Sequence, residues 1–257
     1  MRPKPELHIL EPAELYRAAA ETFVRIAQQA VDANGSFSVA LAGGSTPRAL
    51  YALLAGDPAL RAALPLDCMH FFWGDERHVP PGHADSNFRM AQETMLAKLP
   101  VDAGQVHRIA GENPDAAQAA DDYENVLRVF FRLTATEFPR FDLILLGIGP
   151  DGHTASLFAG TAALEAHARI VVSNRVNQLA TDRITLTAPA INHAANVLIL
   201  VSGADKATAL REVLEGPLDP GRLPAQLIAP RTGTLTWLVD EAAGKLLKNR
   251  NWSGCTP

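Results

Sequence analysis

Cysteine is scarce in this chain. Only Cys68 and Cys255 occur among 257 residues, far apart and outside any CxxC or Cys/His metal pattern. Two such cysteines argue against the disulfide framework of a small secreted domain and against a zinc ribbon. The sequence therefore predicts a protein of a reducing compartment. Because Cys68 directly precedes an apolar run, we expect a small buried side chain and not a nucleophile.

Positive charge is also in short supply, because 23 lysines and arginines stand against 28 aspartates and glutamates, which gives a net charge of -5. Nucleic-acid-binding proteins usually have a basic surface that outweighs their acidic residues. The composition therefore argues against a nucleic-acid partner. Any phosphate that the protein binds must be met by local groups.

Long apolar stretches are missing too. No segment reaches the length of a membrane-spanning helix, and the first six residues, MRPKPE, lack the apolar region of a signal peptide. We therefore expect a cytoplasmic protein without a membrane partner. A hydrophobic fraction of 47% is typical of a packed globular protein. Because no repeat or low-complexity linker divides the chain, we expect residues 1–257 to form a single domain.

What the sequence does contain is a recurring unit of an apolar run, a glycine-containing turn and a helical stretch. The apolar runs predict strands at residues 37–41, 69–73, 141–146 and 197–201. The helix after the first run is expected to have Pro47 as its first residue and Thr46 as its cap. The later helices are expected from about residue 87, as a short turn at 154–158, and over 206–214.

The four runs lack polar alternation, so both faces of each strand should be buried. Such strands, separated by helices, predict an α/β fold: a three-layer, Rossmann-like domain with a mainly parallel central sheet. Ligands bind sheets of this kind at the carboxyl ends of the strands. The runs at 183–187 and 234–238 alternate instead, and we expect them nearer an edge or on a half-exposed face.

The turn after the first strand reads AGGST and leads into a helix. Gly43 and Gly44 permit close approach to the backbone, while the helix N-terminus and the hydroxyls of Ser45 and Thr46 would suit an anion. An ordinary strand-to-helix turn explains the same residues equally well. Because the lysine of a P-loop is missing, nucleotide binding is not supported.

The third strand leads into GIGPDGH, which formally matches the GxGxxG fingerprint of dinucleotide-binding proteins. We reject that interpretation, because Asp151 would face the pyrophosphate and no acidic residue ends the next apolar run at 170–172. The segment is better suited to present Asp151 and His153 at the end of a strand. His153 could then take a proton from water with Asp151 as its support. The alternative is a histidine that caps the following helix.

Two cations each have two interpretations. Lys206 falls in the first turn of a helix, where a cation opposes the helix dipole by about 0.3–1 kcal/mol unless an anion binds there. Otherwise it is an ordinary solvated lysine. Arg77 is either a bidentate phosphate ligand or a surface partner of neighbouring carboxylates. His78 and His83, with Asp85, match no metal-ligand spacing, so we expect surface histidines and no metal site.

Taken together, AGGSTP at 42–47, WGDERHVP at 73–80 and GIGPDGHTASLF at 147–158 closely resemble the motifs of the 6-phosphogluconolactonase family. RITLT at 183–187, GADK at 203–206 and LPAQ at 223–226 extend the likeness over nearly the whole chain. The combination, in this order and spacing, is far more specific than any single motif. One departure, Ala159 where the family commonly has proline, affects nothing catalytic.

That family shares its fold with the glucosamine-6-phosphate deaminases, which also have a Gly-Gly-Ser/Thr turn and an Asp-Gly-His segment. The deaminases continue after the histidine with an Ile-Ala-Phe-Asn-Glu run, where this chain has TASLF, and they have Asp-Glu-Tyr where it has DER at 75–77. The resemblance therefore implies a fold similar to glucosamine-6-phosphate deaminase, without the acids used for ring opening and enolisation.

The resemblance implies hydrolysis of 6-phospho-D-glucono-1,5-lactone to 6-phospho-D-gluconate, the second step of the oxidative pentose phosphate pathway, with no cofactor. By the family pattern, His153 activates the attacking water and Asp151 assists it. The phosphate would be surrounded by Gly43, Gly44, Ser45, Thr46, Arg77 and Lys206. A functional coupling to glucose-6-phosphate dehydrogenase would follow. The alternatives are a deaminase-like isomerase and a non-catalytic sugar-phosphate-binding protein.

Overall fold

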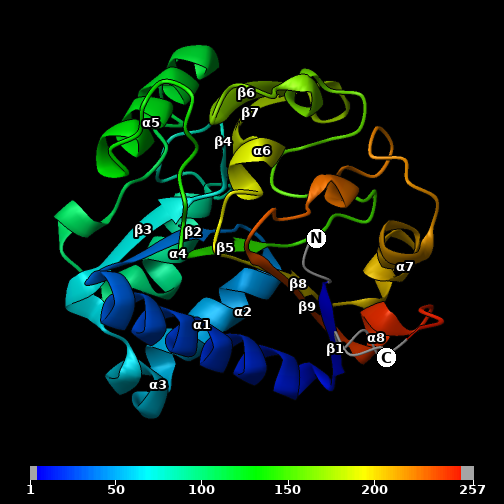
Figure 1. The fold of residues 1–257 in the computed structure, drawn as a ribbon, viewed down its shortest axis with the longest axis horizontal. Helices are drawn as coiled ribbons and strands as arrows, with labels where there is room; N and C mark the ends of the chain where they lie inside the picture. The colour runs from blue at the N-terminus through cyan, green and yellow to red at the C-terminus, as the bar shows by residue number, and fades with distance from the viewer. Residues whose placement is uncertain (1–4, 250–257) are drawn as a thin grey trace.

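A six-stranded parallel sheet crosses the centre of the computed structural model, which describes residues 5–249 (Figure 1). Its strands lie in the order β1-β9-β8-β5-β2-β3. They are β1 (Glu6–Leu10), β2 (Phe37–Leu41), β3 (Met69–Trp73), β5 (Leu143–Leu146), β8 (Asn196–Val201) and β9 (Thr234–Asp240). A second, antiparallel sheet has the order β4-β7-β6 and consists of β4 (Asp75–Arg77), β6 (Val171–Val176) and β7 (Thr181–Leu186).

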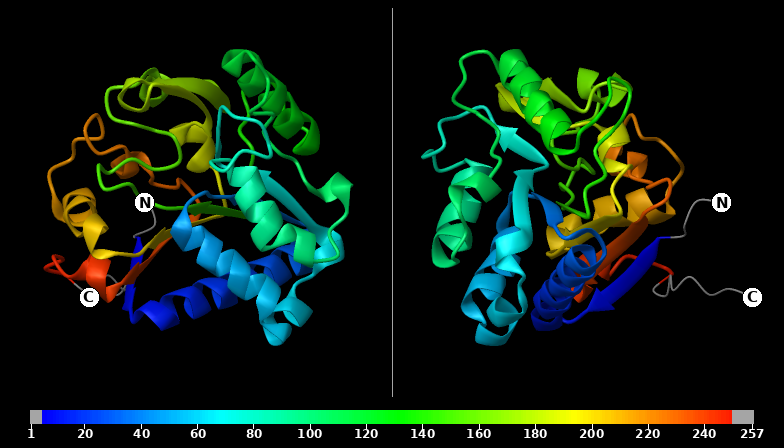
Figure 2. Two further views of the ribbon diagram at one scale, coloured as in Figure 1. Left: turned by 180° about the vertical axis from the view of Figure 1, so that it is seen from behind. Right: turned by 60° about the vertical axis from the view of Figure 1, so that its left-hand side comes forward.

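Helices and the small sheet enclose the central sheet from both sides. In Figure 1, α1 (Pro12–Asn34), α2 (Ser45–Gly56) and α3 (Pro58–Ala63) lie below it, while α5 (Ala116–Phe130), α6 (Ala188–Ile191) and the small sheet lie above it. The remaining helices are α4 (Asn87–Thr94), α7 (Ala207–Glu215) and α8 (Glu241–Gly244). Seen from behind (Figure 2), α2 and α4 lie side by side.

Burial confirms the predicted mainly parallel sheet with two covered faces. Every residue of β2 and β5 is buried, as expected for strands without polar alternation. The alternating run at 234–238 belongs to β9, which lies next to the edge strand β1. The run at 183–187 falls mostly in β7, the middle strand of the antiparallel sheet, which the sequence pattern did not predict.

Two predicted helix starts are wrong. The helix α2 begins at Ser45 with Gly44 as its N-cap and has no side-chain cap, so Thr46 does not cap it and Pro47 is not its first residue. Gly44 has φ +100°, a conformation that only glycine adopts readily, and it starts the helix earlier. Residues 154–158 form a turn with an isolated bridge between Thr154 and Leu157, and no helix.

The remaining boundaries agree with expectation to within two residues, and one prediction of burial is wrong. The helix expected from about residue 87 is α4, and Lys206 ends a short 3-10 turn directly before α7. Cys68 is partly exposed, although we expected it to be buried, because it lies in a 3-10 turn ahead of β3. Cys255 and most of the MRPKPE segment lie outside the described residues. Within residues 5–249, no helix is long and apolar enough to cross a membrane.

Two buried tyrosine hydroxyl groups satisfy the backbone where neighbouring strands end. The Tyr51 hydroxyl of α2 accepts a hydrogen bond from Ala42 N at 3.0 Å and donates one to Ala42 O at 2.9 Å. The Tyr123 hydroxyl of α5 does the same for Trp73, at 2.9 and 3.1 Å. A buried backbone group without a partner is costly, so each hydroxyl stabilises a strand end next to a loop.

Replacing Tyr51 by phenylalanine should destabilise the protein by about 1–3 kcal/mol, because both backbone groups of Ala42 would lose their buried partner. Urea unfolding should show a lower midpoint with an unchanged slope. Tyr16→Phe is the matched control, since the Tyr16 hydroxyl makes only a 3.4 Å contact with Ser202 Oγ. Equal losses in the two variants would contradict the proposed role of the Tyr51 hydroxyl.

Candidate active site

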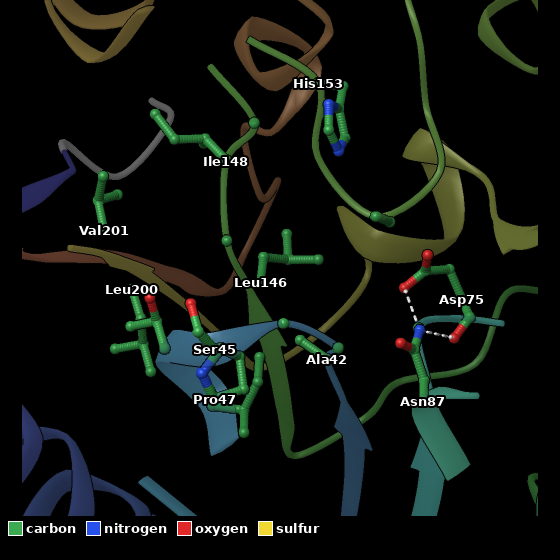
Figure 3. Close-up of a pocket in the computed structure, with 18 of the residues that line it drawn as sticks. Ala42, Ser45, Pro47, Asp75, Asn87, Leu146, Ile148, His153, Leu200 and Val201 are labelled. Carbon is green, nitrogen blue, oxygen red and sulfur yellow. Dashed lines mark hydrogen bonds between the residues drawn. The ribbon is translucent and has the colours of Figure 1, made fainter. Parts of the chain in front are cut away.

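A small cavity of about 230 Å³ lies at the carboxyl ends of β2, β5 and β8 (Figure 3). This is the edge at which ligands bind open parallel sheets. The structure brings seven of the eight predicted site residues to its wall: Gly43, Gly44, Ser45, Thr46, Arg77, His153 and Lys206. Asp151 does not line the cavity and contacts the ring of His153 instead. The size of the cavity suits one compact ligand better than a dinucleotide.

The glycine turn forms one wall. A Cβ atom on Gly43 would overlap the amide of Asn87, and Gly44 has φ +100°, so side chains at either position would disturb the turn. The first turn of α2 has no side-chain cap, which leaves its N–H groups oriented towards the cavity end of the helix. In Figure 3, Ser45 and Ala42 lie across the cavity from His153.

His153, which is in contact with Asp151, lies on the opposite wall. His153 Nδ1 and Asp151 Oδ1 are 2.5 Å apart, and the same oxygen accepts a longer bond from His153 N at 3.3 Å. The hydrogen bond from the His153 side chain lowers the pKa of the Asp151 carboxyl. With Nδ1 bonded to the carboxylate, Nε2 is left as the nitrogen that can accept a proton.

The imidazole ring is held on its face as well as at its edge. The Phe158 ring stacks on it with centroids 4.1 Å apart and an angle of 24° between the planes. The side chain of His153 is 27% exposed, so solvent reaches it. The helix-cap alternative for His153 is wrong, because residues 154–158 form no helix.

The glycines of GIGPDG make room for this pair. A Cβ atom on Gly149 would overlap both His153 Nδ1 and Asp151 Oδ1, whereas one on Gly147 would lie 3.6 Å from the nearest atom, Leu200 O. Gly149 N also donates to His153 O at 2.9 Å, which closes the turn. The match to the dinucleotide fingerprint is therefore formal, since the glycines serve a side-chain pair.

Sequence reasoning missed Asp75 and Asn87, which also line the cavity. Asp75 is 8% exposed and accepts a hydrogen bond from Ser156 Oγ at 2.7 Å. Asn87 Nδ2 donates to Asp75 O at 2.9 Å, with Asp75 Oδ1 at 3.4 Å (Figure 3). An acidic pair directly after a buried strand was the available signal, because charges there need partners.

Glu76, the second acid of that pair, serves the start of α4. Its carboxylate accepts hydrogen bonds from the backbone N–H groups of Asn87 at 2.7 Å and Phe88 at 2.8 Å, and from Ser86 Oγ at 3.1 Å. Burial raises the pKa of this carboxyl, while the backbone hydrogen bonds oppose the rise. The acid that follows Asp75 in sequence therefore positions a helix and does not face the cavity.

The two predicted cations reach the cavity from different elements. Lys206 Nζ lies 2.9 Å from Asp205 Oδ2, so its neighbour already offsets part of the unfavourable dipole interaction. Arg77 Nη1 donates to Asp85 O at 2.7 Å, and no carboxylate among the described residues forms an ion pair with Arg77. Its interpretation as a surface partner of carboxylates is therefore wrong.

The loop histidines are half-buried or exposed. The ring of His78 contacts Asn113 O at 2.6 Å, and His83 lies 3.7 Å from Asp85. Within the part of the chain that the structure describes, no group of three or more potential metal ligands occurs. These two histidines make no contact with the Asp151–His153 pair.

The fold and the site together define an α/β protein with a glycine turn and an Asp–His pair around one cavity at a sheet edge. Residues 10–237 match the model of the family "Glucosamine-6-phosphate isomerases/6-phosphogluconolactonase", and the chain belongs to this family. It is 42% identical over 249 residues to a 6-phosphogluconolactonase of Synechocystis, covering 96% of this chain and 100% of that one.

Solved structures agree with this assignment. The 6-phosphogluconolactonase from Trypanosoma cruzi superposes with a TM-score of 0.84 at 30% identity, over 97% of this chain and 99% of that one. A monomeric glucosamine-6-phosphate deaminase has a TM-score of 0.75 at 19% identity, over 94% and 99% of the two chains, and shows the shared fold alone. The predicted fold similarity to the deaminases is confirmed.

Gly149→Ala should displace the His153 ring, because the new methyl group would occupy the space of its Nδ1 atom. Gly147→Ala is the matched control within the same motif, since its methyl group would make only ordinary contacts. We expect Gly149→Ala to lower the free energy of unfolding by about 1–3 kcal/mol and to shift the His153 ring signals in NMR spectra. Unchanged ring signals in Gly149→Ala would contradict the packing described here.

Proposed function

We propose that the protein hydrolyses 6-phospho-D-glucono-1,5-lactone to 6-phospho-D-gluconate, the second step of the oxidative pentose phosphate pathway. The observation that carries the proposal is that His153, bonded to Asp151, faces a glycine turn across one small cavity. Membership of the family supports it, as do the relatives named 6-phosphogluconolactonase. The enzyme is thus a carboxylic ester hydrolase, specifically a lactonase.

In the proposed mechanism, binding of the phosphate positions the lactone. The N–H groups and hydroxyls of residues 43–46, with Arg77 and Lys206, surround the 6-phosphate dianion. Binding of the phosphate holds the lactone carbonyl beside His153, so the reacting groups are already close together and correctly oriented. The cations come from separate elements on the rim of the cavity, so they meet the phosphate from more than one side.

The chemical step then needs one base. His153 Nε2 takes a proton from water as the oxygen of that water attacks the lactone carbonyl carbon. The bond to the ring oxygen breaks, and the imidazolium returns the proton to that oxygen, which gives the hydroxy acid. Asp151 keeps the ring in the required tautomer and stabilises its charged form. A positioned base contributes typically about 10²–10⁴ in rate.

A deaminase-like isomerase is the nearer alternative, because the fold is shared. Residues 154–158, TASLF, supply no acid next to His153. The second carboxylate that ring opening would need is therefore absent from this segment. The other alternative is a non-catalytic sugar-phosphate-binding protein. That alternative gives the short Asp151–His153 contact no role.

The proposal has two further parts, a cytoplasmic location and a functional coupling to glucose-6-phosphate dehydrogenase. The support is chemical, since that dehydrogenase would release the lactone that this protein consumes. Both the lactone and its hydrolysis product are small, charged and water-soluble. Cell fractionation that placed the protein and the dehydrogenase in different compartments would contradict both parts.

His153→Ala should lower kcat for freshly generated 6-phosphogluconolactone by about 10²–10⁴ while the protein stays folded, because the base is removed. His83→Ala is the matched control, since His83 lies exposed in a loop. A pH-stat or coupled assay measures the rate, and circular dichroism checks the fold. A folded His153→Ala variant with full activity would refute the assigned base.

Asp151→Asn should reduce kcat by at least about 10-fold and change KM little, because the amide no longer enforces the productive tautomer.

The deaminase-like alternative is tested by measuring ammonia release with glucosamine 6-phosphate as substrate. The wild-type protein should release none. Ammonia formation without lactone hydrolysis would favour the deaminase-like alternative instead.

A further inference from the structure

The small antiparallel sheet places two arginines directly opposite each other. In the pairing of β4 with β7, Arg77 is the partner of Arg183. Directly opposed residues project from the same face of a sheet with their Cβ atoms about 4.5–5.5 Å apart, and like charges there are destabilising. Without a ligand, the positive charges of Arg77 and Arg183 therefore repel each other at the position where Arg77 reaches the cavity.

Arg183 also lacks a partner of its own. Across residues 5–249, no oxygen accepts a hydrogen bond from its guanidinium group and no carboxylate lies within ion-pair distance of it. It is nevertheless half-buried, and burial followed by the charge of Arg77 lowers its pKa. Two other half-buried arginines, Arg108 and Arg128, each form an ion pair with a glutamate. A desolvated guanidinium with five donors and no acceptor is an unusual arrangement.

The carboxylates nearest to this pair are already engaged elsewhere. Asp75 accepts from Ser156 and Asn87, and Glu76 caps the start of α4. Asp85 is 70% exposed and interacts with His83. These groups moderate the positive charge at Arg183 without occupying its donors. An anion from outside the chain is therefore the natural acceptor.

The face that carries both arginines points towards the active-site loop. On the same face, Asp75 lies opposite Thr185, and both side chains hold Ser156, three residues after His153. Arg77 itself lines the cavity together with Gly44 and Ser45. A second hollow beside the cavity shares these three residues, which places the glycine turn and the arginine next to each other.

We propose that Arg183 is a second phosphate-binding arginine, which joins Arg77 in holding the 6-phosphate of the substrate. This rests on the proposed function for the identity of the ligand. Two guanidinium groups present planar forks of donors that match the oxygens of a phosphate dianion. Binding would turn the repulsion between the arginines into attraction to a shared anion. Arg183 thereby selects phosphorylated over plain sugar lactones.

Equilibrium binding tests the proposal separately from catalysis. Isothermal titration of the wild-type protein with 6-phosphogluconate and with D-gluconate should show binding of the phosphorylated acid only. Arg183→Met should raise Kd for 6-phosphogluconate by about 10- to 100-fold, the cost of losing hydrogen bonds to a charged group. Arg183→Lys should fall between the two, because an ammonium group keeps the charge but loses the fork.

Arg175→Met is the matched control. Arg175 follows Asn174 on β6, projects from the opposite face and pairs with Asp182 at 3.1 Å, so its loss should leave Kd unchanged. The alternative is that Arg183 has a purely structural role, as a hydrogen-bond donor to Asn174 Oδ1. That atom is buried and has no partner among the described residues. This alternative predicts the reverse pattern. In that case Arg183→Met would lower Tm without the ligand and leave Kd as in the wild type, which would overturn the proposal.

Steady-state kinetics with a phosphorylated and a plain lactone provide a second test of the proposal. For the phosphorylated lactone, Arg183→Met should raise KM by the same factor as Kd with little change in kcat, and turnover of glucono-1,5-lactone should be unaffected. Equal losses on both lactones would overturn the proposal, as would a wild-type protein that fails to bind 6-phosphogluconate. If the wild type binds 6-phosphogluconate in an Arg183-dependent way but hydrolyses no lactone, only the proposed function fails.

Discussion

The hydrogen bonds of one buried carboxylate, Asp75, hold the site together. It lies one glycine after the central-sheet strand β3 and is the first residue of β4 in the small sheet. It accepts hydrogen bonds from Ser156, in the loop that carries His153, and from Asn87, at the start of α4. A buried charge requires such partners, so the position of one element constrains the other three. The loop needs this anchor, because Ala155 has a positive φ of 47° and the segment forms no regular structure of its own.

The two sheets supply different residues of the site. The central sheet supplies the glycine turn after β2 and the Asp151–His153 loop after β5, at the edge where parallel strands leave backbone groups for ligands. The small sheet supplies the opposed pair Arg77 and Arg183. The strands therefore set the positions of His153 and of the two arginines, and the loops between them need to span only short distances.

An acidic protein can present a basic pocket because its nearby carboxylates are used internally. The net charge is -5, yet Arg77 and Lys206 reach one cavity. Glu76 caps a helix and Asp151 bonds to the His153 ring, so both carboxylates are already engaged within the chain. The charge around a small cavity can therefore differ from the net charge of the whole chain.

The sequence alone determined the parallel sheet, the glycine turn and the Asp151–His153 segment, because buried strands, glycines and short-range spacing leave a local signal. Only the tertiary structure decided that residues 154–158 form a turn, that Gly44 starts α2, and that Asp75 and Asn87 line the cavity. The pairing of Arg77 with Arg183, 106 residues apart in sequence, likewise had no local signal. Such contacts depend on strand pairing and on buried polar groups finding distant partners, which no window of neighbouring residues contains.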